Sequence, residues 1–237
     1  MAGPIGNLTS PNLWPSMVQK NEFPGFIPNL PEQDELVWQI LDPSHDDSLK
    51  TQLDALLEQY GHVVPTLPDS VSTDDSKGPI CIDDRAIIGE CVRIEGPCYI
   101  GPNAEVRHAA YIRPYTWLCS ESVVGHASEV KHSLLLPGAK APHFNYVGDS
   151  ILGQGVNLGA GCKLSNLRND ERSVIVRGLS GGDVDSKLRK FGAILGDGVA
   201  IGCNVVTNPG VIIGEGSNVW PNLNISGVFD AKSSIRK

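Results

Sequence analysis

The stretch IDDRAIIGECVRIEGPCYIGPNAEVRHAAYIRPYTWLCSESVVGHASEV, residues 82–130, repeats with a period of six residues. Each hexad opens with an aliphatic residue, and small residues recur four places later. The aliphatic positions are Ile82, Ile88, Ile94, Ile100, Val106, Ile112, Leu118, Val124, Val130 and, one hexad further, Leu136. A period of six fits no helical stripe, but it suits stacked coils of three short strands around an aliphatic interior. The sequence therefore predicts a mainly β fold, a parallel β-helix of about six to seven coils.

Two segments depart from this period. The first lies between Leu136 and Leu152 and contains KAPHFNYVGD, residues 140–149. The second is residues 165–192, whose SVIVRG and GG indicate a hairpin-like excursion. Because insertions in repeat folds often carry function, we expect the chemistry at the first break.

The first part of the chain has a different character. Residues 1–78 hold nine of the 17 prolines and are predicted to form a proline-rich arm with two short helices. We expect these helices at residues 32–41 and 46–60, the second with a leucine stripe on one face, followed by a linker at residues 65–78. The predicted domains are thus residues 1–78 and a β-helix domain at residues 79–237.

Composition excludes some classes of protein. The net charge of −8 argues against a general nucleic-acid binder. The sequence has no apolar run long enough to span a membrane, and its first residues lack the basic and apolar parts of a secretory signal. The six cysteines form no CxxC pair and are expected to be reduced and buried as small apolar residues. We therefore expect a cytoplasmic protein without a membrane span or a nucleic-acid partner.

The run KAPHFNYVGD, followed by SILGQGVNLGAG, resembles a known family. It is similar to the acetyltransferase domain of the bifunctional N-acetylglucosamine-1-phosphate uridylyltransferase/glucosamine-1-phosphate acetyltransferase. It is closer still to the archaeal sugar-1-phosphate nucleotidylyltransferases that share this domain. The resemblance implies a left-handed β-helix of hexapeptide repeats and homotrimers with each site between neighbouring subunits. The sequence lacks the family's nucleotidylyltransferase signature G-x-G-x-R-x-x-P, so sugar-nucleotide synthesis is not expected.

The resemblance also implies roles for individual residues. His143 matches the general base of the family. The substrate-binding positions match Arg113, Lys131, Tyr146 and Asn157, and the acetyl-CoA positions match Ala160, Asn166 and Cys203. These roles suit the chemistry, because acetyl transfer needs a neutral amine, histidine titrates near neutral pH, and arginine and lysine bind phosphate. We expect these residues to meet on one side of the stacked coils.

The leading hypothesis is therefore an acetyl-CoA-dependent N-acetyltransferase acting on an amino-sugar phosphate such as glucosamine 1-phosphate. A second is a non-catalytic trimeric scaffold or regulatory protein whose arm binds a partner. A third is a metalloenzyme similar to the γ-carbonic anhydrases, with zinc held by His108, His126 and His132. The spacing of the last two histidines does not match that family, so no metal site is expected.

Overall fold

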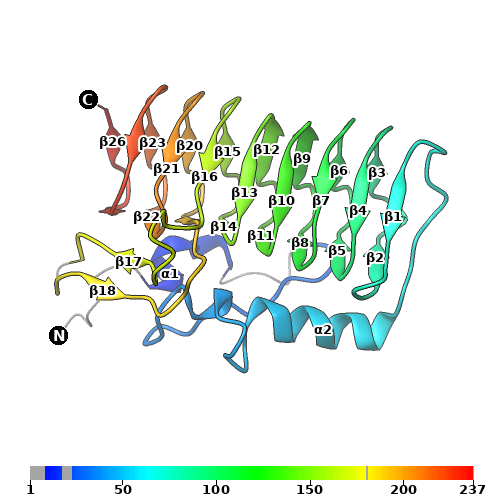
Figure 1. Cartoon of the computed structure of the whole chain (residues 1–237), viewed down its shortest axis with the longest axis horizontal. Coiled ribbons are helices and arrows are strands. Elements are labelled where there is room, and N and C mark those ends of the chain that lie inside the picture. The colour runs from blue at the N-terminus through cyan, green and yellow to red at the C-terminus, as the bar shows by residue number, and fades with distance from the viewer. Residues whose placement is uncertain (1–8, 18–22, 180, 237) are drawn as a thin grey trace.

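The structure is a computed structural model that describes residues 9–17, 23–179 and 181–236. The chain forms a three-sided solenoid of parallel strands with a helical layer along one side (Figure 1). Each side of the solenoid is an eight-stranded sheet, and successive strands of the chain move from one side to the next. We call the three sheets face A, face B and face C.

The strands of each face follow one another at intervals of about one coil. Face A contains β2 (Ile80–Ile82), β5 (Cys98–Ile100), β8 (Thr116–Leu118), β11 (Ser133–Leu135), β14 (Ile151–Leu152), β19 (Ala193–Leu195), β22 (Val211–Ile213) and β25 (Val228–Phe229). Face B contains β1 (Ser72–Asp74), β4 (Arg93–Glu95), β7 (Tyr111–Ile112), β10 (Glu129–Lys131), β13 (Tyr146–Gly148), β16 (Lys163–Leu164), β21 (Val206–Thr207) and β24 (Asn224–Ile225). Face C contains β3 (Ile87–Ile88), β6 (Glu105–Val106), β9 (Val123–His126), β12 (Lys140–His143), β15 (Asn157–Leu158), β20 (Ala200–Ile201), β23 (Asn218–Val219) and β26 (Ser234–Ile235).

These faces confirm the predicted fold class, a left-handed parallel β-helix of hexapeptide repeats. The aliphatic residues of the hexads fill its interior, as expected from their period. The predicted six to seven coils were too few, because each face has eight strands. The solenoid already begins at β1, inside the segment interpreted as a linker, where Thr73 pairs with Ile94.

The segment at residues 140–149 does not interrupt the solenoid, and here the sequence-based prediction was wrong. Its residues form β12 and β13, which pair with strands on both sides. What changes is the spacing: Ile112 pairs with Val130 eighteen residues on, whereas Val130 pairs with Val147 after only seventeen. The repeat between β10 and β11 therefore has five residues instead of six.

This lost residue also corrects the position of Leu136. Because neighbouring residues of a strand point to opposite sides, a shift of one residue exchanges inside for outside. Leu135 therefore points into the solenoid, and Leu136 packs in the second apolar cluster, outside the coils. A second shortened hexad separates Val147 from Leu152.

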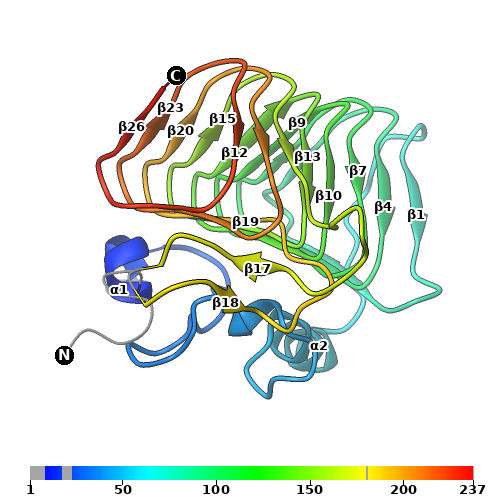
Figure 2. The ribbon, with the colours of Figure 1, turned by 60° about the vertical axis from the view of Figure 1, so that its left-hand side comes forward.

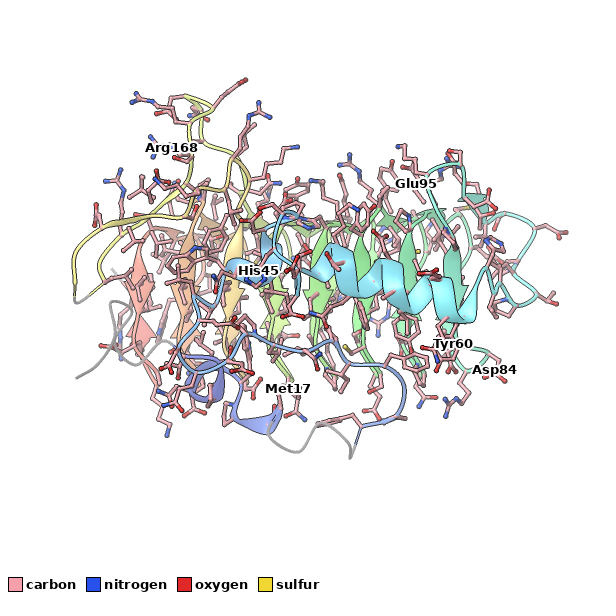
Figure 3. All side chains as sticks on the ribbon, turned by 90° about the horizontal axis from the view of Figure 1, so that it is seen from below. Met17, His45, Tyr60, Asp84, Glu95 and Arg168 are labelled. Atoms are coloured by element: carbon pink, nitrogen blue, oxygen red, sulfur yellow. The ribbon has the colours of Figure 1, made fainter. Side chains whose placement is uncertain are left out.

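A layer formed by residues 9–17 and 23–60 covers face A (Figure 3). It contains α1 (Ser10–Leu13), the 3-10 helix η2 (Gln39–Leu41) and α2 (Leu49–Tyr60). The outward side chains of face A that pack against it are apolar: Cys81, Tyr99, Trp117, Leu134, Ile151, Ile194 and Ile212. Two indoles also donate hydrogen bonds across this contact, from Trp14 Nε1 to the Leu195 oxygen and from Trp117 Nε1 to the Phe26 oxygen, both at 3.0 Å. Face A is thus an apolar interface along much of its length.

The second predicted helix is confirmed and the first is not. In α2 the Ser48 side chain caps the first turn, and Leu49, Leu53 and Leu57 are buried. The segment at residues 32–41 forms only the short η2, without a side-chain cap. Val37, Trp38, Ile40 and Leu41 are all buried there.

The excursion at residues 165–192 forms the predicted hairpin. Its strands β17 (Ile175–Val176) and β18 (Val184–Asp185) are antiparallel. The hairpin runs below the solenoid, close to α1 (Figure 2). Its apolar side chains join the cluster over face A, where the Phe191 ring lies 6.2 Å from that of Trp38. The excursion therefore packs against the N-terminal layer.

Candidate active site

The edge between faces C and B carries a column of histidines. His143, at the end of β12, pairs with His126 of β9, and His108 occupies the same place one coil earlier. The rings of His108 and His126 are stacked, with centroids 5.4 Å apart and 12° between their planes. On the next coils this column continues with Ala160 and Cys203. The exposed His143 is thus the last imidazole before a run of small side chains.

A buried asparagine fixes the turn that carries His143. The Asn145 Oδ1 accepts the backbone N–H of His143 at 2.9 Å, and its Nδ2 donates to the Gly159 oxygen at 2.8 Å. The Asn145 side chain is only 3% exposed, so both bonds are shielded from water. Asn145 therefore links the histidine turn to the glycine-rich turn of the next coil, GAG at residues 159–161.

The outer side of face B carries two ion pairs. Arg113, just after β7, contacts Glu129 of β10, with the Nη1 and Oε1 atoms 2.7 Å apart. Lys131 of β10 contacts Asp149, just after β13, with the Nζ and Oδ2 atoms 3.1 Å apart. The first pair is about one-third exposed, whereas the Asp149 side chain is almost fully buried. The two predicted phosphate-binding cations therefore each have a carboxylate partner.

Asp149 is the centre of a buried polar network. Its carboxylate accepts hydrogen bonds from Lys131, from His132 Nδ1 at 2.8 Å and from the Asn166 amide. Burial acts to raise the pKa of Asp149, but the hydrogen bond and charge of His132 and the charge of Lys131 bring this pKa below its ordinary value. The Asn166 Oδ1 also accepts from the Tyr146 hydroxyl at 3.4 Å. Asp149 thus connects Lys131, Asn166 and Tyr146.

A shallow groove of about 520 Å³ lies beside this network. Its walls come from the turn after His143, from Tyr146 and Glu129 on face B, and from the start of the excursion at Asn166 and Leu167. Burial and the nearby charges of Asp149 and Glu129 raise the pKa of Tyr146, which keeps its hydroxyl protonated as a hydrogen-bond donor. The groove offers a polar surface next to the histidine edge.

The predicted site residues lie on more than one side of the solenoid. Arg113, Lys131, Tyr146 and Asn166 are on face B or at its margin. Asn157 belongs to β15 of face C and is exposed there. His143, Ala160 and Cys203 stand on the edge between these faces. The expectation that all of them meet on one side was wrong, because a strand on face C cannot present its outer side chains to face B.

Sequence reasoning missed Asn145, Asp149 and Glu129 as members of the site. A signal for Asn145 was available, since the equivalent positions of the two preceding coils hold the small residues Ala110 and Ser128. A larger polar residue at such a buried position must find hydrogen-bond partners. The signals for Asp149 and Glu129 were weak, because only the folded coils bring them beside Lys131 and Arg113.

Among residues 9–17, 23–179 and 181–236, no three His, Cys, Asp or Glu side chains are grouped so that they could hold a metal ion. No helix in the described part of the chain combines the length and the apolarity needed to cross a membrane.

The hexad solenoid and its histidine edge define a left-handed β-helix protein of the hexapeptide-repeat class. A family described as the GMPPB C-terminal domain matches residues 94–213, and the chain belongs to this family. The resemblance drawn from the sequence is thereby confirmed.

Curated relatives match the same region. The bifunctional sugar-1-phosphate nucleotidylyltransferase/acetyltransferase of Sulfurisphaera tokodaii is 39% identical over 157 residues, which are 61% of this chain and 37% of the relative. The bifunctional protein GlmU of Methanocaldococcus jannaschii is 44% identical over 144 residues, 61% of this chain and 34% of the relative. The chain thus spans little more than a third of the length of these relatives.

Solved structures match the chain at low identity. The polySia-specific acetyltransferase NeuO is 11% identical with a TM-score of 0.41, and the match covers 69% of this chain and 81% of that one. AntD, an N-acyltransferase from Bacillus cereus solved with dTDP-4-amino-4,6-dideoxyglucose and coenzyme A, is 15% identical with a TM-score of 0.34, covering 77% and 86%.

Proposed function

We propose that the chain is an acetyl-CoA-dependent N-acetyltransferase that acts on an amino-sugar phosphate. The observation that carries this proposal is the histidine edge, where the exposed His143 is held by Asn145 and followed by the small Ala160 and Cys203. The membership in the family supports this proposal, as does the name of the Sulfurisphaera tokodaii relative, which includes an acetyltransferase.

In the proposed reaction, the neutral amine of the sugar attacks the carbonyl carbon of the acetyl thioester. His143 accepts the proton that the nitrogen loses as the new C–N bond forms. The tetrahedral intermediate then collapses, the C–S bond breaks, and the thiolate of CoA leaves and takes up a proton. A backbone N–H of the glycine-rich turn at residues 159–161 would stabilise the oxyanion, and its small residues allow close approach.

In this proposal the two cations of face B have different tasks. The Arg113–Glu129 pair is partly exposed, and such a pair contributes only about 0–1 kcal/mol, so a phosphate can replace Glu129 at low cost. In the described part of the structure the Arg113 Nε is also buried without a partner. Lys131 instead stays with the buried Asp149. We therefore propose Arg113 as the main phosphate ligand and Lys131 as a support of Asp149, Asn166 and Tyr146.

Residues of faces B and C cannot enclose one cavity within a single chain. Asn157 on face C and Tyr146 on face B come together only if face C of one subunit approaches face B of another. The proposed assembly is a homotrimer with each site between neighbouring subunits, as the family resemblance implies. In this arrangement face A, covered by the N-terminal layer, stays on the outside.

The test is release of CoA thiol from acetyl-CoA with a panel of amino-sugar 1-phosphates. We expect His143→Ala to lower kcat by about 10²–10⁴, the usual contribution of a general base. The matched control is His126→Ala, which removes the neighbouring imidazole of the same column and leaves the base in place. Full activity of the His143→Ala protein would refute the mechanism, and no thiol release with any acceptor would refute the reaction.

A further inference from the structure

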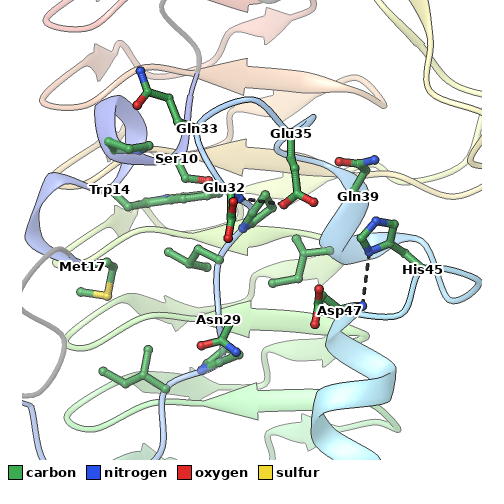
Figure 4. A pocket seen from close by; sticks show the side chains of 16 residues that line it. Ser10, Trp14, Met17, Asn29, Glu32, Gln33, Glu35, Gln39, His45 and Asp47 are labelled. Carbon is green, nitrogen blue, oxygen red and sulfur yellow. Dashed lines mark hydrogen bonds between the residues drawn. The ribbon is translucent and has the colours of Figure 1, made fainter.

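A cavity of about 400 Å³ lies within the N-terminal layer, remote from the histidine edge. It is bounded by α1, by the extended segment at residues 27–35 and by the chain from η2 to the start of α2 (Figure 4). Its volume falls in the range of pockets that bind small ligands, about 300–1,000 Å³. Because the layer covers face A, the cavity and the edge between faces B and C lie on opposite sides of the solenoid.

The wall of this cavity is apolar and rigidly held. Trp14 and Ile40 are nearly fully buried, and Ile27 and Leu30 complete the apolar part. The Trp14 indole is fixed by its hydrogen bond to the Leu195 oxygen. The side chains can therefore receive an apolar group without first being ordered.

The rim of the cavity is acidic. It contains Glu32, Glu35 and Asp47, and among the described residues that line the cavity none is a lysine or an arginine. Glu35 is half-buried, and its Oε2 accepts the backbone N–H of Glu32 at 2.7 Å. Figure 4 shows Glu32 and Glu35 together on one side, with Asp47 beside His45 on another. The cavity thus favours a positively charged guest.

A second observation at the same cavity also indicates a ligand. Ser10 lines it and is only 6% exposed, and its Oγ is buried without a hydrogen-bond partner in the described part of the structure. A buried hydroxyl without a hydrogen-bond partner is unfavourable, because it has lost its bonds to water. A guest with N–H groups would remove this cost, because the hydroxyl oxygen can accept.

We propose that this cavity binds an organic cation with an apolar body, an amine or a guanidinium. Its charged group would reach the Glu35 carboxylate and the Ser10 hydroxyl, while its apolar part would lie on the half-buried Ile27 and Leu30. Such a cation could be a small free amine or a basic side chain of a peptide. This site is independent of the proposed acetyl transfer, since none of its lining residues belongs to the histidine edge or to the network on face B.

The test is calorimetric titration of the full chain at low ionic strength with 4-phenylbutylamine. Its matched probe is 4-phenylbutanol, which has the same apolar body and no charge. We expect the amine to bind about fivefold or more tightly than the alcohol, as for one partly exposed ion pair, and its affinity to fall with added salt. A capped Leu-Arg-Leu peptide is titrated in parallel to distinguish a free amine from a basic side chain of a polypeptide. Tighter binding of the peptide than of the amine indicates a polypeptide ligand.

Substitutions of the acidic residues test where the charged group of the amine binds. Glu35→Gln keeps the size of the side chain and should weaken the amine about fivefold while leaving the alcohol unchanged. Asp34→Asn is the matched control, since this exposed neighbour does not line the cavity. Asp47→Asn provides a second test on an exposed residue of the rim, with a smaller loss in the same direction. Equal binding of amine and alcohol, or an unchanged affinity in both rim variants, would overturn the proposal.

Discussion

Replacing Asp149 by asparagine tests how much its buried contacts with Lys131 and His132 stabilise the protein. Asp149 is 4% exposed and is the buried partner of Lys131 and His132, at 3.1 and 2.8 Å. An asparagine fits the same space but leaves Lys131 without a negative partner. Loss of one member of a buried ion pair costs about 3–5 kcal/mol. We therefore expect the free energy of unfolding at neutral pH to fall by about this amount in the Asp149→Asn protein.

The pH dependence gives this prediction a sign. The folded-state pKa of Asp149 lies below the ordinary value of 3.8, because His132 and Lys131 together outweigh the effect of burial. A carboxyl with a lowered folded-state pKa contributes its full stability above the unfolded-state value, and this contribution is lost as the pH falls through the folded-state pKa. The difference between the wild-type and the Asp149→Asn protein should therefore be largest at neutral pH and shrink in acid.

Urea unfolding of both proteins across this pH range is the assay. Asp84→Asn is the control, because the Asp84 side chain is 90% exposed and should change stability little. Adding Lys131→Met to Asp149→Asn should restore part of the loss, since the unpaired cation is then gone. A loss below about 1 kcal/mol, or a difference that stays constant into acid, would refute the reasoning.

Three further predictions concern single side chains. Arg113→Ala should raise the KM for the sugar phosphate by about tenfold with little change in kcat, and an unchanged KM in steady-state assays would remove Arg113 as the phosphate ligand. Asn145→Ala should lower kcat by about tenfold, because the turn that carries His143 loses both its side-chain hydrogen bonds. If the urea midpoint of unfolding falls as well and accounts for the lost activity, Asn145 has a purely structural role. Leu53→Ala in α2 should lower the free energy of unfolding by about 2–5 kcal/mol, measured by urea titration, since Leu53 is fully buried against face A; a change below about 1 kcal/mol would contradict this interface.

The period of six residues was enough to predict the interior of the solenoid, because each hexad places one aliphatic residue inside. It was not enough to follow the register past Val130. There one repeat has five residues instead of six, so Leu135 is the inward residue. Leu136 also lies six residues after Val130 in the sequence, but it packs outside the coils. Two adjacent leucines look equivalent in sequence, and only the pairing of Leu135 with Leu118 distinguishes them.

The sequence alone led to His143 as a candidate base, but not to the residues that surround it in the structure. His143 carries a recognisable motif, whereas Glu129 and Asp149 matter only through their contacts with Arg113 and Lys131 across neighbouring coils. The separation of Asn157 from Tyr146 could have been derived by counting hexads, since consecutive hexads occupy consecutive faces.

The layer over face A has a consequence for the order of events during synthesis. Its residues leave the ribosome before those of the solenoid, yet the surface they cover is completed only later. The Trp14 indole bonds to the Leu195 oxygen, 181 residues further along the chain. Such distant contacts form slowly, because the intervening chain must first be ordered. Trp14 must therefore stay unburied until β19 has been made, whereas α2 lies against β2 and β5 and can pack soon after they form. During this interval the exposed indole makes the nascent chain prone to aggregation.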